Sequence, residues 1–213
     1  MELAWTAFGA GSVPVGAVLL DGEGAAVASG RNRMYEQEAP PPQIANSRLA
    51  HAEVNALIGL SPGRRYEDHL VTALEPCPLS IGAVVLSTVG TLTYLGGDPY
   101  AGAVGSFGQT PHTRRVPLRI RGPRRDPLGG LASAPQIAWY LQRIPDGHVV
   151  RARWRRRCRR SGSWLGSSGP RVSGCGSGLV STLVHRLRMT ARMWAWMFTV
   201  RLGSRGRPTA GRC

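Results

Sequence analysis

Two stretches of sequence decide how this 213-residue chain folds: AHAEVNAL at residues 50–57 and LEPCPLS at residues 74–80. The first has the apolar spacing of a helix, and His51 and Glu53 stand two residues apart at its start. In the second, a strand-like run ends at a proline, a residue that the first turn of a helix tolerates. This stretch also places Cys77 26 residues after His51. The sequence therefore predicts two helices that begin with residues of metal-binding type.

A histidine, a nearby acid and a cysteine at helix starts suit hydrolysis assisted by zinc. Zinc held by three protein ligands lowers the pKa of a bound water to about 7, and an acid beside the site can carry the proton. The dipole and free amides of a helix start favour thiolate over thiol. The alternative is structural: His51 and Glu53 would cap a helix, and Cys77 would be a small buried apolar residue.

The order of the two motifs resembles the zinc-dependent cytidine/deoxycytidylate deaminase superfamily, whose members show H-x-E followed by P-C-x-x-C. Here the pattern runs His-Ala-Glu and then Pro-Cys-Pro-Leu-Ser. The resemblance implies that His51 and Cys77 are zinc ligands, that Glu53 shuttles protons and that Zn2+ is the cofactor. It covers roughly residues 2–144.

Flanking segments match the same superfamily and add two substrate contacts. Residues 14–17 look like its first strand, and residues 30–33 look like the segment after its second strand. In that segment the family's asparagine contacts the substrate. The resemblance therefore makes Asn32 a candidate substrate-binding residue, and it turns the backbone of Ala52 toward the base.

Ser80 departs from the superfamily's pattern, since the second cysteine of the motif falls on this serine. The resemblance places Ser80 at the third zinc-ligand position, and a hydroxyl that keeps its proton is a poor zinc ligand. Two functions follow. One is a zinc-dependent hydrolytic deaminase of a nucleobase, a nucleoside or a tRNA base. The other is a catalytically impaired pseudo-deaminase that retains the fold while zinc binding is weakened.

Hydrophobic periodicity predicts an α/β domain. Helices are expected over residues 2–9, 50–60, 76–88 and 135–143, and strands over residues 13–20, 25–30, 69–74 and 91–95, with a strand or extended segment over 115–121. The alternation predicts a three-layer sandwich, in which a mixed sheet of about five strands has helices on both faces. This is the architecture that the resemblance to cytidine deaminases also implies.

Composition divides the chain abruptly. The formal net charge is +15, with 27 Arg and no Lys, yet residues 1–144 are almost neutral and residues 145–213 have Asp146 as their single acid. We therefore expect a deaminase-like domain over residues 1–150 and an Arg/Gly/Ser-rich tail over residues 151–213 that is disordered or frameshifted. The alternatives are a nucleic-acid-binding arm and an amphipathic helix on a membrane surface.

Partners and location follow partly from composition and partly from the resemblance. The uncharged stretch at residues 76–97 is interrupted by Pro, Gly, Ser and Thr and does not predict a membrane span. The start of the chain lacks the pattern of a signal peptide, so a cytoplasmic location is expected. The resemblance implies that the ligand is a small-molecule nucleobase or nucleoside, or a base within tRNA. It also implies a homodimer.

Overall fold

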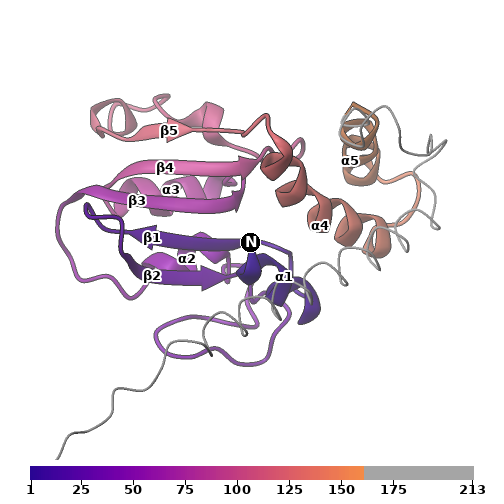
Figure 1. Ribbon diagram of the computed structural model, residues 1–213, viewed down its shortest axis with the longest axis horizontal. Coiled ribbons are helices and arrows are strands. Elements are labelled where there is room, and N and C mark those ends of the chain that lie inside the picture. Colours follow the sequence, from indigo (N-terminus) through magenta and orange to yellow (C-terminus); the bar gives the residue numbers. More distant parts are fainter. Residues whose placement is uncertain (161–213) are drawn as a thin grey trace, which may run out of the picture. The chain divides into compact units, whose positions relative to one another are not determined.

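One mixed sheet organises the protein, whose computed structural model describes residues 1–160 (Figure 1). Its strands are β1 (Gly16–Leu20), β2 (Ala26–Arg31), β3 (Arg65–Leu74), β4 (Val89–Gly96) and β5 (Arg119–Arg121). They lie in the order β2-β1-β3-β4-β5. β1 is antiparallel to both β2 and β3, whereas β3, β4 and β5 run parallel. The predicted mixed sheet of about five strands is confirmed.

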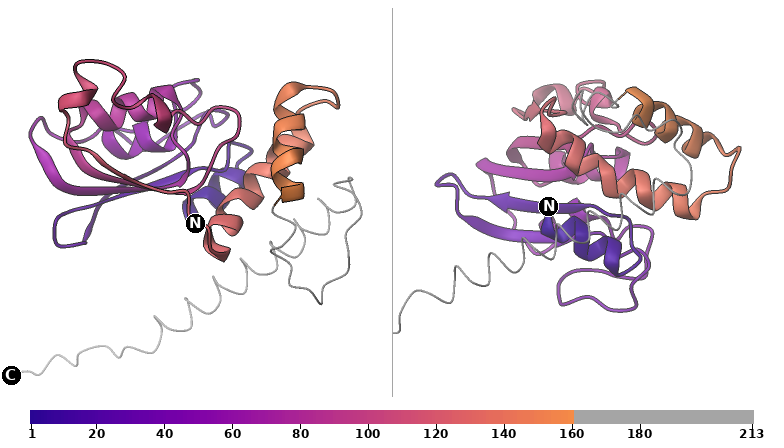
Figure 2. Two further views of the ribbon diagram at one scale, coloured as in Figure 1. Left: turned by 90° about the horizontal axis from the view of Figure 1, so that it is seen from above. Right: turned by 45° about the vertical axis from the view of Figure 1, so that its right-hand side comes forward.

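Five helices of residues 1–160 accompany this sheet, and four of them cover its two faces while the last packs on the helix before it. They are α1 (Glu2–Gly9), α2 (Ala52–Leu57), α3 (Pro78–Leu86), α4 (Pro127–Arg143) and α5 (Val149–Arg160), with short 3-10 turns η1 (Val104–Ser106) and η2 (Thr113–Arg115). Figure 2 shows α2 and α3 on one face, and α1 and α4 on the other. The predicted three-layer α/β sandwich is therefore confirmed.

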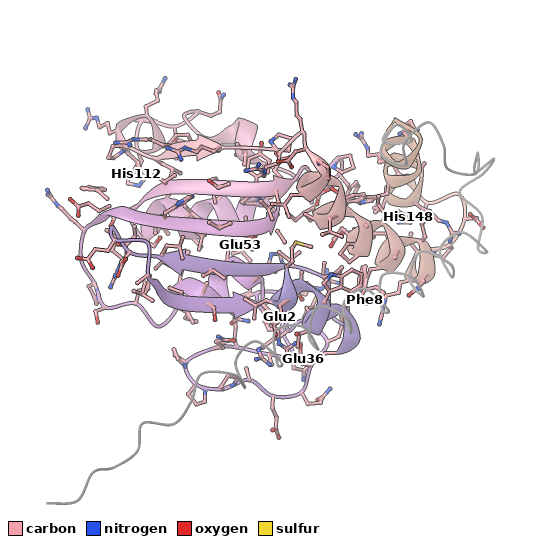
Figure 3. All side chains as sticks on the ribbon, in the orientation of Figure 1. Glu2, Phe8, Glu36, Glu53, His112 and His148 are labelled. Carbon is pink, nitrogen blue, oxygen red and sulfur yellow. The ribbon has the colours of Figure 1, made fainter. Side chains whose placement is uncertain are left out.

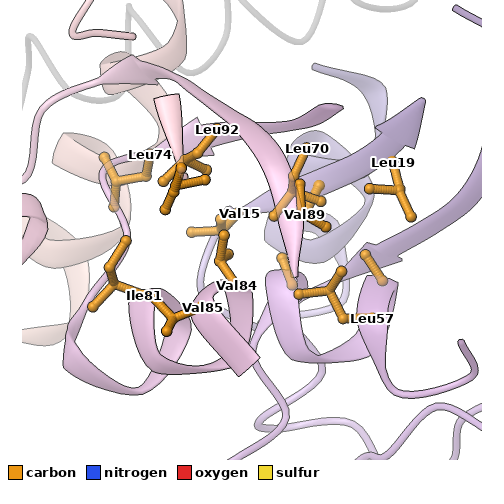
Figure 4. Packing of buried hydrophobic residues seen from close by; sticks show 14 of the residues in the cluster. Val15, Leu19, Leu57, Leu70, Leu74, Ile81, Val84, Val85, Val89 and Leu92 are labelled. Atoms are coloured by element: carbon orange, nitrogen blue, oxygen red, sulfur yellow. The ribbon is translucent and has the colours of Figure 1, made fainter. Parts of the chain in front are cut away.

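The core that positions the site lies between the sheet and helices α2 and α3. Leu19, Leu70 and Leu92 stand opposite one another on β1, β3 and β4, and all three are fully buried. Figure 4 shows this row packed toward Leu57 of α2 and Val84 of α3. Burying a leucine side chain stabilises a fold by about 1.5–3 kcal/mol, so this row fixes both helices on one face.

The start of α2 is also fixed by its close approach to β2. A Cβ at Gly30 would lie 2.4 Å from the carbonyl oxygen of Ala52, so only glycine leaves room for the helix here. Asn55, which is buried in α2, donates through Nδ2 to the carbonyl oxygen of Arg31 at 3.0 Å. The end of β2 and the first turn of α2 are thereby held together.

The predicted start of α4 was wrong. The helix begins at Pro127 rather than at residue 135, because Asp126 caps it and accepts a hydrogen bond from the Gly129 amide at 3.3 Å. Pro135, where we expected the helix to begin, lies inside it.

Helix α5 continues across the boundary predicted at residue 150. Trp154 is fully buried and stacks on Tyr140 of α4, with ring centroids 5.6 Å apart and planes at 22°. The rest of the predicted tail, residues 161–213, lies outside the described residues, so the expected disorder of that segment stays a prediction. Within the described part of the chain, no helix is both long and apolar enough to cross a bilayer.

Replacing Trp154 with Ala is expected to lower the free energy of unfolding by about 3–5 kcal/mol, the usual cost of emptying a buried aromatic site. The indole Nε1 finds no hydrogen-bond partner within residues 1–160, so this loss reflects packing. Urea unfolding of the full chain measures it. Val149→Ala, at a half-exposed position of the same helix, is the matched control. A change below about 0.5 kcal/mol for Trp154→Ala would show that α5 does not belong to the folded domain.

Candidate active site

The two sequence motifs meet where α2 and α3 begin. His51 is the N-cap of α2 and Cys77 is the N-cap of α3, and both have an extended backbone conformation. β3 ends at Leu74 and delivers Cys77 three residues later. Because both helices start at the same end of the sheet, near the last residue of β3, their free amide groups point toward the same region.

Three side-chain atoms of the motifs form a triangle. Cys77 Sγ lies 3.4 Å from His51 Nδ1 and 3.6 Å from Ser80 Oγ, and Ser80 Oγ lies 3.4 Å from His51 Nδ1. With zinc–ligand bonds of about 2.0–2.3 Å, a tetrahedral ion holds two of its ligand atoms about 3.4–3.6 Å apart. The spacing of the three predicted ligands therefore fits three corners of a zinc site.

The donor set of this triangle differs from that of an ordinary zinc site. Within residues 1–160, no three His, Cys, Asp or Glu side chains gather as a metal-binding group, because the third donor is the hydroxyl of Ser80. The imidazole of His51 also hydrogen-bonds to the backbone of Arg48, an interaction that orients metal-binding histidines in proteins. The site offers one nitrogen, one sulfur and one neutral oxygen.

His51 and Cys77 favour each other's charged forms. The hydrogen bond with Cys77 is the largest influence on His51 and raises the pKa of the imidazole above its ordinary value, against the opposing effect of burial. Burial is the largest single influence on the pKa of the Cys77 thiol and raises it. The hydrogen bonds with His51 and Ser80, together with the charge of His51, outweigh burial and bring that pKa below its ordinary value.

Glu53 lies beside the triangle and is held at both carboxylate oxygens. Thr72 Oγ1 donates to Oε1 at 2.6 Å, and Ser80 Oγ donates to Oε2 at 2.8 Å. The exposed fraction is 3% for Glu53, 0% for Thr72 and 1% for Ser80. In Figure 3, Glu53 lies in the middle of the domain, whereas His112 and His148 are far from it.

Sequence reasoning did not single out Thr72. Along β3, Leu70, Thr72 and Leu74 alternate with residues of the other face, and all three are buried. A polar residue in an otherwise apolar inward row needs a buried partner. That pattern is the signal that points to Thr72, and its partner is Glu53.

A cavity of about 120 Å³ opens beside Glu53 and collects the predicted substrate contacts. Asn32 and Ala52 both line it, together with His51 and Cys77. Asn32 is buried, and its Oδ1 accepts a hydrogen bond from the backbone amide of Met34 at 3.1 Å. The cavity is of the same order as, and somewhat smaller than, a cavity of about 150 Å³ that holds a benzene ring.

Helix α4 closes this cavity with two side chains that sequence reasoning missed, Gln136 and Tyr140. They stand four residues apart on one face of the helix and hydrogen-bond to each other. Gln136 Oε1 is buried and has no hydrogen-bond partner within residues 1–160. Burial, with a contribution from the charge of Asp98, raises the pKa of Tyr140 to about 12, so its hydroxyl stays neutral near pH 7.

A larger cavity of about 310 Å³ lies elsewhere, against α2 and α3. Its lining, which includes Leu57 and Leu86, is mainly apolar and contains no His, Cys or acidic residue. Titratable groups with shifted pKa values cluster at functional sites, and the smaller cavity is lined by two of them, His51 and Cys77, whereas the larger one is not. We therefore place the candidate active site at the smaller cavity.

Comparison with known proteins agrees with this geometry. The family model described as the cytidine and deoxycytidylate deaminase zinc-binding region matches residues 1–95. The tRNA-specific adenosine deaminase of Bacillus subtilis is 33% identical over 132 residues, which are 58% of this chain and 76% of that protein.

Two further similarities differ in how much of each protein they cover. The tRNA(Ile)-lysidine synthase of Deinococcus radiodurans is 37% identical over 97 residues, which are 44% of this chain and only 15% of that protein. A solved structure from a study of A-to-I editing by tRNA:A34 deaminases is 25% identical, with a TM-score of 0.50. That similarity covers 62% of this chain and 93% of the solved one.

Proposed function

The chain belongs to the cytidine and deoxycytidylate deaminase family, and from this premise we propose that it is a zinc-dependent hydrolytic deaminase. Its substrate would be a nucleobase, a nucleoside or a base in tRNA. The observation that carries the proposal is the triangle of His51, Cys77 and Ser80, which has zinc-like spacing and has Glu53 at its side.

In this proposal His51, Cys77 and Ser80 hold the metal and Glu53 moves protons. Zinc, when bound, supplies an activated water for attack on an amidine carbon. Glu53 receives the proton that this water loses and passes it to the ring nitrogen, and a second proton goes to the leaving amine. The balance is N=C–NH2 + H2O → HN–C=O + NH3, so one proton of the water ends on the ring nitrogen and the other leaves with the ammonia. Each carboxylate oxygen of Glu53 accepts one hydroxyl hydrogen bond and keeps a further lone pair for this transfer.

Substrate binding falls to the walls of the 120 Å³ cavity. We assign the side chain of Asn32 and the backbone of Ala52 to orienting the base, since both line the cavity beside Glu53. The Bacillus subtilis relative is named for adenosine in tRNA, which supports including tRNA bases among the substrates. A homodimer and a cytoplasmic location belong to the same proposal.

Ammonia release tests the proposed activity. The full chain with added zinc is expected to release ammonia from at least one member of a panel of cytidine, deoxycytidylate, adenine, guanine and an adenosine-containing anticodon stem-loop. Ser80→Cys is assayed beside it, because a thiolate is the stronger zinc donor. If Ser80→Cys carries zinc and releases ammonia while the native chain does neither, the alternative holds, and the native chain is a pseudo-deaminase that has kept the fold.

A further inference from the structure

A chain of hydrogen bonds runs from the sheet through Glu53 to the triangle. Thr72 Oγ1 donates to one carboxylate oxygen at 2.6 Å, and Ser80 Oγ donates to the other at 2.8 Å. All three side chains are at least 97% buried, so water does not compete for these bonds. Thr72 comes from β3, Glu53 from α2 and Ser80 from α3, so the chain joins three elements of the fold.

The direction of the bond between Ser80 and Glu53 decides what the serine oxygen can do. A hydroxyl has one hydrogen and two lone pairs, and an ionised carboxylate can only accept. Because the hydrogen of Ser80 points at Glu53, the lone pairs of Oγ are left for the side where His51 Nδ1 lies at 3.4 Å and Cys77 Sγ at 3.6 Å. Hydrogen bonding to a carboxylate also raises the basicity of the donor group.

We propose that the hydrogen bond from Ser80 to Glu53 makes the serine oxygen competent as the third zinc donor, and that Thr72 is a positioning residue that holds Glu53 in place for this purpose. The proposal rests on the zinc site of the proposed function. Glu53 thus has two tasks in this chain, proton transfer and orientation of Ser80. In a protein with cysteine at position 80, a thiolate has no hydrogen to donate and the second task disappears.

Zinc affinity, measured by competition with a chromophoric chelator, tests this without any assay of activity. Glu53→Ala is made in the native chain and in Ser80→Cys. Outer partners of metal ligands typically contribute about 10–100-fold to metal affinity, so we expect that loss in the native background. In the Ser80→Cys background, Glu53→Ala removes only the charge of Glu53. The decrease in zinc affinity should therefore be at least about tenfold smaller there than in the native background.

Two conservative variants separate hydrogen bonding from folding. Glu53→Gln keeps an acceptor oxygen for Ser80 and is expected to retain more zinc affinity than Glu53→Ala. Thr72→Val removes one hydroxyl at constant shape and should weaken zinc binding by about 2- to 10-fold, whereas Thr72→Ser should restore it. Circular dichroism of each variant confirms that the fold is intact.

Each outcome bears on the proposal. Equal losses in both backgrounds would mean that Glu53 acts through charge alone, which overturns the inference. Zinc bound by Ser80→Cys but not by the native chain would overturn the inference and leave the assignment of the metal site standing. If neither protein bound zinc, the inference and the proposed function would fail together.

Discussion

Glu53→Gln is expected to lower the rate of ammonia release by about 10²- to 10⁴-fold, the usual contribution of a positioned general acid and base. Glutamine has nearly the same shape and can still accept from Ser80, but it cannot take up the proton that the attacking water loses. Because Glu53 is 3% exposed and bonded at both oxygens, no other acid of the cavity can move into its place without breaking these contacts.

The measurement is kcat for the substrate identified in the panel, with zinc content determined on the same sample. Glu67→Gln is the matched control, because Glu67 lies on the same sheet in β3 but is exposed, and it should leave kcat within about twofold. A Glu53→Gln protein that binds zinc and turns over at the native rate would remove Glu53 from the mechanism. Retained zinc with lost turnover is the expected result, because zinc binding and proton transfer use different properties of this side chain.

Ser80→Cys is expected to raise zinc affinity on the order of 100-fold, because a thiolate replaces a neutral hydroxyl as the third donor. The triangle already has the required spacing, with 3.4 Å to His51 Nδ1 and 3.6 Å to Cys77 Sγ, so the new sulfur needs no rearrangement of the backbone. Elemental mass spectrometry gives zinc per chain in the purified protein. Chelator competition then gives the affinity of each form.

Ser87→Cys is the matched control, since it makes the same change at the other end of α3, away from the triangle. It should leave the zinc affinity unchanged. Equal affinities for the native chain and Ser80→Cys would contradict the prediction. Under limiting zinc, the gain in affinity should appear as a matching gain in ammonia release.

Local patterns predicted most of the fold. Apolar and β-branched runs between turn signals identified β1, β2 and β4, and the predicted hairpin of β1 and β2 is present. The start of α4 was predicted wrongly because two prolines, Pro127 and Pro135, both suit a first turn, and only the contact of Asp126 with the Gly129 amide selects the earlier one. Helix α5 has seven Arg over residues 151–160, so we did not predict a helix there from the apolar pattern of the sequence. In the structure it is held by the stacking of Trp154 on Tyr140.

The periodicity of the sequence by itself predicted the mixed sheet, because periodicity is a property of neighbouring residues, and the resemblance of its motifs to the deaminase superfamily supplied the candidates His51, Glu53, Cys77, Ser80 and Asn32. Only the tertiary structure decided what these residues face. It turned the hydroxyl of Ser80 toward Glu53, placed Thr72 on the other carboxylate oxygen and closed the cavity with Gln136 and Tyr140 of α4. The contact of Thr72 with Glu53 spans 19 positions in the sequence, and that of Ser80 with Glu53 spans 27. The geometry of both depends on how the sheet and helices pack, which no local sequence pattern predicts.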